Sequence, residues 1–245
     1  MICFLTSSTV IPGTEILNPA NRFMEELQRY FPKECRMLFI CSDPDDHERT
    51  GFFADSIRRS FENAGFRFTD FQILDSRNED QTADLVEAAD LIILAGGHVP
   101  TQNRFFHKIS LKEKLKDYQG ILIGISAGSM NSAAVVYAQP EREGEAYDPD
   151  YQRFLEGLGL SETMLVPHYQ DVKDDVLDGL RLFEDITYPD SMGRTFYAIP
   201  DGSYLFIEEG KEELRGEAYR IRDGIIAKIA EEGDCLSLTD RKEIL

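Results

Sequence analysis

The sequence of 245 residues predicts an α/β fold with a mostly parallel sheet that helices cover on both faces. Short apolar runs alternate with longer amphipathic ones through the first half, as in strands joined by crossover helices. The runs Leu91–Leu94 and Ile121–Ile123 are apolar at consecutive positions, which a strand buried on both faces requires. In the last third, short strand-like runs between turn signals predict antiparallel hairpins.

In chain order, the first half is predicted to hold five strands and four helices. The predicted strands are Ile2–Thr6, Met37–Ser42, Phe66–Ile73, Leu91–Ala95 and Ile121–Ile125. The predicted helices are Asn21–Phe31, Glu48–Ala64, Gln81–Ala88 and Gln102–Asp117. Within Glu48–Ala64, for example, Phe53, Ile57 and Phe61 recur at helical spacing.

The second half begins with a charged, proline-containing stretch, Gln139–Asp150, which predicts a loop. An apolar strand, Met164–Val166, follows and ends in Pro167-His168. The last predicted strands are Thr195–Pro200, Tyr204–Glu208, Glu217–Arg222 and Ile225–Ala230. Asp201-Gly202 and Asp223-Gly224 are hairpin signals, so we expect these strands to extend one edge of the sheet. No linker interrupts the chain, which predicts one domain over residues 1–245.

Charge and composition exclude several classes of function. The formal net charge of −19 repels nucleic acid and anionic membranes, so neither is an expected partner. No apolar stretch approaches the roughly 20 residues of a membrane helix, and the N-terminus lacks the features of a signal peptide, which predicts a cytoplasmic protein. The four cysteines have no zinc-site spacing and the glycines form no phosphate loop, so we expect no metal and no cofactor.

The most specific motif is Gly124-Ile125-Ser126-Ala127-Gly128, between an apolar strand and a run of small residues. A G-x-S-x-G sequence between a strand and a helix is typical of a nucleophile elbow. The turn is tight, so the neighbours of the serine must be small. The helix that follows directs free N–H groups and a partial positive charge toward the site, which favours an oxyanion. Ser126 is therefore the predicted nucleophile.

A serine needs a base, and His168 is the best candidate among four histidines. It directly follows a strand, as Ser126 does, and the carboxyl ends of parallel strands meet at one edge of a sheet. His47 and His107 lie in predicted surface or packing positions. A carboxylate should orient the histidine. The loop between Ser126 and His168 contains several carboxylates. The residues alone do not choose among Glu141, Glu143, Glu145, Asp148 and Asp150.

A second glycine pair, Gly96-Gly97, follows the strand Leu91–Ala95. A backbone N–H in this turn is a candidate oxyanion donor opposite the N–H of Ala127. His98 and Gln102 come next in the chain, and we expect them to line the substrate pocket.

Together these motifs resemble the peptidase E and cyanophycinase family of serine peptidases, whose fold is like that of class I glutamine amidotransferases. The resemblance spans most of the chain and includes the closing strands from Ala198 onward. It implies a hydrolase that cleaves small peptides through an acyl-enzyme on Ser126, with His168 as base and then acid. The N–H groups of Gly97 and Ala127 would hold the oxyanion. Glu141 would be the acidic member, with Glu143 and Glu145 as alternatives, and a homodimer is compatible with the family.

Two features depart from the family pattern. Members that act on aspartyl peptides are expected to carry basic residues after the histidine, whereas the stretch Tyr169–Asp175 is mostly acidic. His98 and Pro100 also replace the commoner residues of the glycine turn. Two other hypotheses remain at this point. One is an α/β-hydrolase esterase, although His168 lies far from the end of the chain. The other is a non-catalytic amidotransferase-like binding domain.

Overall fold

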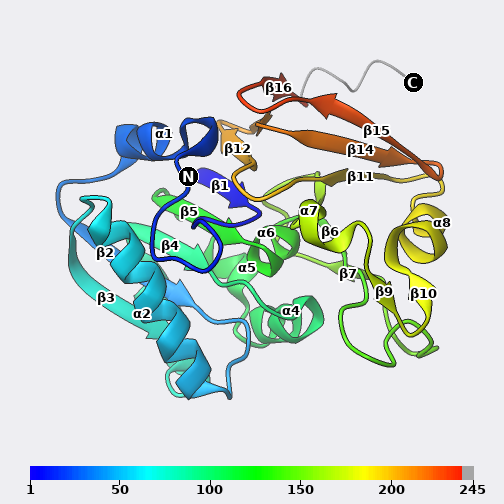
Figure 1. Ribbon diagram of the computed structural model, residues 1–245. Helices are drawn as coiled ribbons and strands as arrows, with labels where there is room; N and C mark the ends of the chain where they lie inside the picture. The colour runs from blue at the N-terminus through cyan, green and yellow to red at the C-terminus, as the bar shows by residue number, and fades with distance from the viewer. Residues whose placement is uncertain (239–245) are drawn as a thin grey trace.

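The computed structural model describes residues 1–238, and its larger sheet has eight strands in the order β16-β13-β12-β1-β5-β4-β2-β3 (Figure 1). Its parallel part consists of β1 (Ile2–Thr6), β2 (Cys35–Ile40), β3 (Phe68–Leu74), β4 (Leu91–Leu94) and β5 (Ile121–Ile125). Beside β1, the antiparallel strands β12 (Tyr204–Glu208), β13 (Lys211–Arg215) and β16 (Cys235–Ser237) extend the sheet. The strands predicted in the first half therefore all form.

Helices cover both faces of this sheet. They are α1 (Phe23–Tyr30), α2 (His47–Asn63), α3 (Thr82–Ala88), α4 (Val99–Lys108) and α5 (Leu111–Lys114). Phe61 of α2 packs in one apolar cluster with Ile93 of β4, and Phe105 of α4 packs in another with Ile92 of the same strand. This arrangement confirms the predicted α/β class. The helix expected over Gln102–Asp117 is split, because Ser110 has a left-handed backbone with φ 52°.

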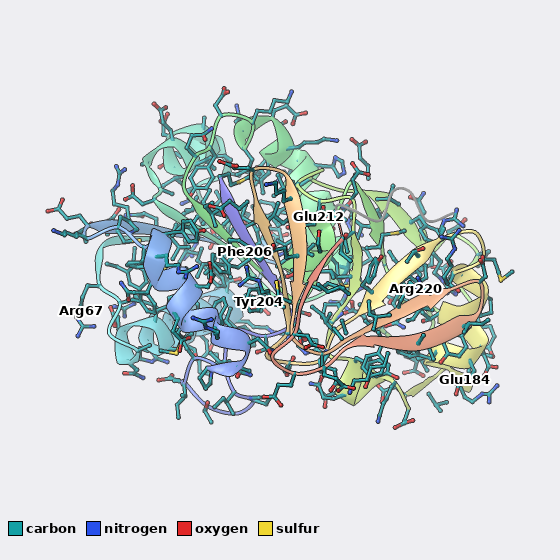
Figure 2. All side chains as sticks on the ribbon, turned by 90° about the horizontal axis from the view of Figure 1, so that it is seen from above. Arg67, Glu184, Tyr204, Phe206, Glu212 and Arg220 are labelled. Atoms are coloured by element: carbon teal, nitrogen blue, oxygen red, sulfur yellow. The ribbon has the colours of Figure 1, made fainter. Side chains whose placement is uncertain are left out.

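A second sheet of four strands, in the order β15-β14-β11-β8, lies beside the first (Figure 2). Its strands are β8 (Met164–Val166), β11 (Thr195–Ala198), β14 (Ala218–Arg222) and β15 (Ile225–Ala230). Tyr204 and Phe206 mark β12 of the first sheet in Figure 2, and Arg220 marks β14 of the second. Only part of the C-terminal region thus extends the main sheet, which corrects the expectation of one extended edge.

Asp223-Gly224 forms the predicted hairpin turn, because β14 pairs with β15 on either side of it. Asp201-Gly202 does not. The strand before it, β11, pairs with β8 and β14, whereas the strand after it, β12, pairs with β1 and β13. The turn therefore crosses from one sheet to the other, and this position has consequences for the site.

The remaining elements are short. They are α6 (Ala127–Asn131), β6 (Val135–Tyr137), β7 (Phe154–Glu156), α7 (Tyr169–Val172), β9 (Val176–Leu177), β10 (Leu180–Arg181), α8 (Tyr188–Asp190), two 3-10 turns (Ala20–Arg22 and Glu79–Gln81) and a π-helical turn (Leu182–Thr187). Among them, β6 pairs with β7 and β9 with β10 in two further two-stranded sheets. Within residues 1–238, no helix combines the length and the apolar character that crossing a membrane would need.

Candidate active site

Ser126 stands on the sharp turn between β5 and α6. Its backbone has φ 50° and ψ −111°, a conformation that a residue with a side chain rarely adopts. Its N–H donates to the Thr6 carbonyl at 3.0 Å, which fixes the turn to β1. A Cβ on Gly124 would lie 2.8 Å from Ser129 Cα, and one on Gly128 would lie 2.7 Å from Leu94 Cβ. Close packing therefore requires both glycines, as the nucleophile-elbow interpretation expected.

His168 follows β8 in a left-handed conformation with φ 56°. Its Nδ1 lies 2.8 Å from Oδ1 of Asp201, the residue that follows β11 and Pro200. Ser7, just after β1, joins the two, because its hydroxyl donates to Asp201 Oδ1 at 2.6 Å and accepts the His168 backbone N–H at 2.8 Å. His168, at the end of β8, is therefore held by groups from the ends of two other strands, β1 and β11.

The protonation state of the Asp201 carboxyl suits its hydrogen bond with His168. Burial raises the pKa of its carboxyl, but hydrogen bonds from His168 and Ser7 outweigh the burial and leave that pKa below its ordinary value. An ionised carboxylate accepts a hydrogen bond from Nδ1–H, which leaves Nε2 of His168 as the basic nitrogen. This is the orientation that a histidine needs in order to deprotonate a serine.

The carboxylate on His168 is thus Asp201, which corrects the expectation that Glu141 would take this place. Within residues 1–238, neither Glu143 nor Glu145 is recorded in a hydrogen bond with His168, and Glu145 instead bonds His98. From the sequence, the acid was expected in the loop before His168, and Asp201 was expected in a hairpin turn. Only the crossover between the two sheets brings Asp201 to the histidine, and strand pairing is not visible in one sequence. Ser7 was missed for the same reason.

The two predicted oxyanion donors lie on separate segments next to Ser126. Neither the N–H of Gly97 nor that of Ala127 has a hydrogen-bond acceptor within residues 1–238. A Cβ on Gly96 would lie 3.4 Å from Ser126 Cβ, which places this turn against the nucleophile. Gly97 has φ 149°, and a Cβ there would overlap the side chain of Ser42. Two free donors beside a serine are suited to hold an oxyanion.

Ser126 and His168 line one open cavity of about 580 Å³. Apolar side chains form much of its wall, and charged residues stand around it: Asp43, Asp46, Arg49, Glu141 and Arg142. The structure records no direct hydrogen bond between Ser126 and His168 among its described residues. Such bonds are often long without substrate and tighten when it binds.

Of the two residues expected to line this cavity, His98 lies on its wall and Gln102 does not. His98 does line it, but both of its ring nitrogens contact protein, Nδ1 with Thr101 Oγ1 and Nε2 with Glu145 Oε1, each at 2.8 Å. Burial lowers the pKa of His98, and the charge of Glu145 opposes that change. Gln102 is fully buried behind the cavity, and its Nε2 donates to the Ala95 carbonyl at 2.7 Å. It is therefore not a pocket residue, which corrects that expectation.

Glu141 lies on the cavity wall, accessible to solvent but enclosed by surrounding protein. Partial desolvation raises the pKa of its carboxyl to about 7, repulsion from Glu145 adds to the rise, and Arg142 and His168 oppose it. Its backbone N–H donates to Glu145 Oε2 at 2.9 Å, so the loop that carries it is tied to His98. Glu141 is thus an ionisable wall group whose charge appears near neutral pH.

This pKa predicts a pH dependence of stability. Folding raises the pKa of Glu141 above its ordinary value of 4.5, so the folded protein holds this proton more tightly than the unfolded chain. The resulting stabilisation is present below pH 4.5 and is lost as the pH rises through about 7. We expect the Tm of the wild type, relative to Glu141→Gln, to fall over this interval. Parallel Tm curves for both proteins from pH 4.5 to 8 would contradict this assignment.

One group of side chains also has the geometry of a metal site. The ligand atoms of His168, Asp171 and Asp201 lie within 4.8 Å of one another. A cation there would compete with the hydrogen bond between His168 and Asp201. We therefore assign these two side chains to each other and keep the prediction of no metal.

Comparison with known proteins identifies the family and supports the fold. The model of peptidase family S51 matches residues 3–215. The structure of a peptidase from an acI-B1 Actinobacterium superposes with a TM-score of 0.63 at 16% identity, covering 97% of this chain and 96% of that one. A putative peptidase E protein from Listeria monocytogenes EGD-e superposes with a TM-score of 0.54 at 15% identity, covering 94% and 98%. No curated protein matched the sequence.

Proposed function

The chain belongs to peptidase family S51 and is a serine-type peptidase, and on this premise we propose that it cleaves small peptides through an acyl-enzyme on Ser126. The observation that carries the proposal is the hydrogen-bonded series Ser7, Asp201 and His168 beside a strained serine. Each member comes from a different strand end. A serine and a histidine that line one cavity, with an acid bonded to the histidine, support nucleophilic catalysis.

In the proposed mechanism, Ser126 Oγ attacks the carbonyl carbon of the scissile bond while Nε2 of His168 takes the hydroxyl proton. The carbonyl oxygen becomes an oxyanion, which accepts hydrogen bonds from the N–H groups of Gly97 and Ala127. His168 then gives its proton to the amide nitrogen, the C–N bond breaks, and the amine leaves. Water attacks the acyl-enzyme, again with His168 as base. The C–Oγ bond then breaks while His168 returns this proton to Oγ, which releases the acid and restores Ser126. Asp201 stabilises the imidazolium throughout.

The size of the cavity supports a small substrate. A volume of about 580 Å³ accommodates a few residues, and the loop containing Glu141 and Arg142 closes one side. Glu145 holds this loop in place, because it bonds His98 and both backbone N–H groups at the start of the loop. A longer peptide would have to displace these contacts.

The charges of the wall do not favour an acidic side chain. Three carboxylates and two guanidinium groups line the cavity. We therefore expect dipeptides with a neutral N-terminal residue to be cleaved at least as fast as their aspartyl counterparts. A panel of Ala-X, Leu-X, Lys-X and Asp-X dipeptides, assayed by release of new amino groups, checks this. Cleavage of Asp-X peptides alone would contradict it.

The acyl-enzyme has a test of its own. Hydroxylamine added during turnover should convert part of the acid product to the hydroxamate, because it competes with water for the acyl group on Ser126. Ser126→Ala gives the matched control and should form neither product. If the wild type turned over peptides without any hydroxamate at high hydroxylamine concentration, direct attack by water would replace the proposed mechanism.

A further inference from the structure

Behind the cavity lies a cluster of three amide side chains that the mechanism does not use. Gln102 and Asn131 are 0% exposed, and Asn103 is 6% exposed. Gln102 and Asn103 belong to α4, and Asn131 is the last residue of α6, the helix that begins after Ser126. Buried amides lose hydration, so each should have a partner inside the protein.

The bonds of this cluster have a specific arrangement. Gln102 Nε2 donates to the Ala95 carbonyl at 2.7 Å, and Asn131 Nδ2 donates to the Val99 carbonyl at 3.2 Å. Asn131 Nδ2 also donates to Gln102 Oε1 at 3.0 Å, which joins the two side chains. Ala95 and Val99 directly precede and follow residues 96–98, which we call the oxyanion turn. The cluster therefore holds the oxyanion turn at both of its ends.

The same cluster is attached to the nucleophile helix through Asn131. The two oxyanion donors belong to different segments, since Gly97 lies in the oxyanion turn and Ala127 opens α6. A turn that contains two glycines has little conformational preference of its own. Donors in an oxyanion hole act only when they are fixed near hydrogen-bond distance from the developing charge. Some structure must therefore set the position of one segment relative to the other.

We propose that Gln102 and Asn131 are positioning residues that lock the oxyanion turn onto the nucleophile helix. The inference rests on the proposed function, because it assumes that Gly97 and Ala127 serve one reaction on Ser126. An apolar pair of similar volume would fill the same space without the cost of burying amides. The hydrogen bonds of Gln102 and Asn131 instead fix the carbonyl groups of Ala95 and Val99, the residues on either side of the oxyanion turn. An apolar pair would not supply this directional restraint.

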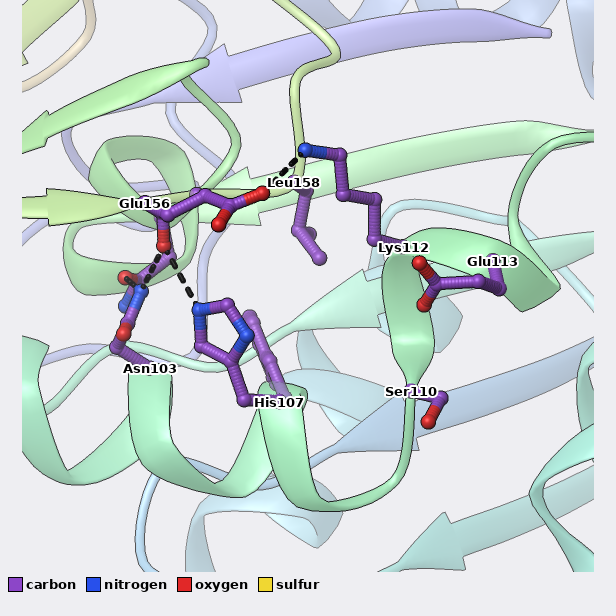
Figure 3. A pocket seen from close by; sticks show the side chains of 10 residues that line it. Asn103, His107, Ser110, Lys112, Glu113, Glu156 and Leu158 are labelled. Carbon is purple, nitrogen blue, oxygen red and sulfur yellow. Dashed lines mark hydrogen bonds and ion pairs between the residues drawn. The ribbon is translucent and has the colours of Figure 1, made fainter.

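The third amide provides a matched control. Asn103 Nδ2 donates to Asn131 Oδ1 at 3.0 Å and to the Glu156 carbonyl at 2.8 Å, so it faces β7 and has no bond to the oxyanion turn. Figure 3 shows this far end of the cluster, where Asn103 and His107 both approach the Glu156 carbonyl at a second pocket. Loss of Asn103 should affect stability as much as loss of the other amides does, without releasing the turn.

The test compares Gln102→Met and Asn131→Leu with Asn103→Leu. For each variant, the second-order rate of phosphonylation by a fluorophosphonate is measured, together with kcat, KM and Tm. Phosphonylation forms the Oγ–P bond and expels fluoride, and the resulting phosphonyl oxygen occupies the position of the oxyanion. We expect Gln102→Met and Asn131→Leu to lower kcat and the labelling rate by about 10²-fold with little change in KM, as misplaced catalytic groups do. Asn103→Leu should lower Tm but keep the wild-type rates.

Two results would overturn the proposal: wild-type labelling by both Gln102→Met and Asn131→Leu, or an equal loss of rate in Asn103→Leu. Where a methionine or leucine variant does not fold, the alanine variant is measured below its unfolding temperature. Ser126→Ala distinguishes failure of this inference from failure of the proposed function on which it rests. If Ser126→Ala is inactive while the amide variants are normal, only the positioning role fails. If Ser126→Ala turns over peptide, the proposed function itself fails.

Discussion

Ser126→Ala and His168→Ala are each expected to lower kcat by about 10⁶-fold, and the double variant should fall no further. The serine forms the covalent bond, and the histidine moves every proton of both half-reactions, so neither is useful without the other. Tm should change little, because neither Ser126 nor His168 belongs to the apolar core clusters. Steady-state and single-turnover assays on a good dipeptide substrate measure the three values.

The control for this prediction is a neighbouring serine in α6, the helix that follows the turn. Ser129 lies three residues after Ser126, and its hydroxyl donates to the Thr6 carbonyl at 2.7 Å inside the core. Ser129→Ala should cost stability and leave most of the activity. A multiplicative loss in the double variant of Ser126 and His168 would mean that the two residues do not act as one unit.

Asp201→Asn is expected to lower kcat by about 10⁴-fold. An asparagine amide carries no charge and can turn its NH2 group toward Nδ1, so the imidazole would lose both its favoured tautomer and the charge that stabilises its protonated form. Because Ser7 also bonds Asp201 and the backbone of His168, the histidine should remain in place. The measurement is kcat against pH for wild type and variant, with Tm as the check on folding.

Glu141→Gln is the matched control for Asp201→Asn. Each variant removes one carboxylate near the site. Glu141 lines the cavity, whereas Asp201 bonds His168. We expect a loss of at most about tenfold from Glu141→Gln, the size of a changed long-range charge. If Glu141→Gln lost activity 10⁴-fold and Asp201→Asn kept it, the sequence-based choice of acid would be right and the structural assignment wrong.

The sequence predicted the parts of this molecule that depend on local pattern. β1, β5, β12 and β15 have the bounds that apolar periodicity and turn signals predicted. The tight turn at the serine predicted that its neighbours must be small. The structure agrees, because a Cβ on Gly124 or Gly128 would clash with surrounding atoms. These features are set by residues within a few positions of one another, so they are present in the sequence itself.

The parts that the sequence did not predict depend on pairing between distant segments. Asp201 was assigned to a hairpin because an Asp-Gly pair between two strands is usually one, and the sheet order that separates β11 from β12 has no local signal. Gln102 was placed in the pocket because it follows the glycine turn. The helix instead turns its side chain inward to Ala95, and only the direction of α4 decides this.

The central claim is that Ser126 is a nucleophile activated by the pair of His168 and Asp201. Mass labelling with a fluorophosphonate tests it most directly, on wild type, Ser126→Ala, His168→Ala and Asp201→Asn. We expect one adduct on Ser126 in the wild type, none in Ser126→Ala, and strongly slowed labelling in the other two variants. An unlabelled wild type that also resists a smaller sulfonyl fluoride, or labelling that persists at the wild-type rate in His168→Ala, would contradict it.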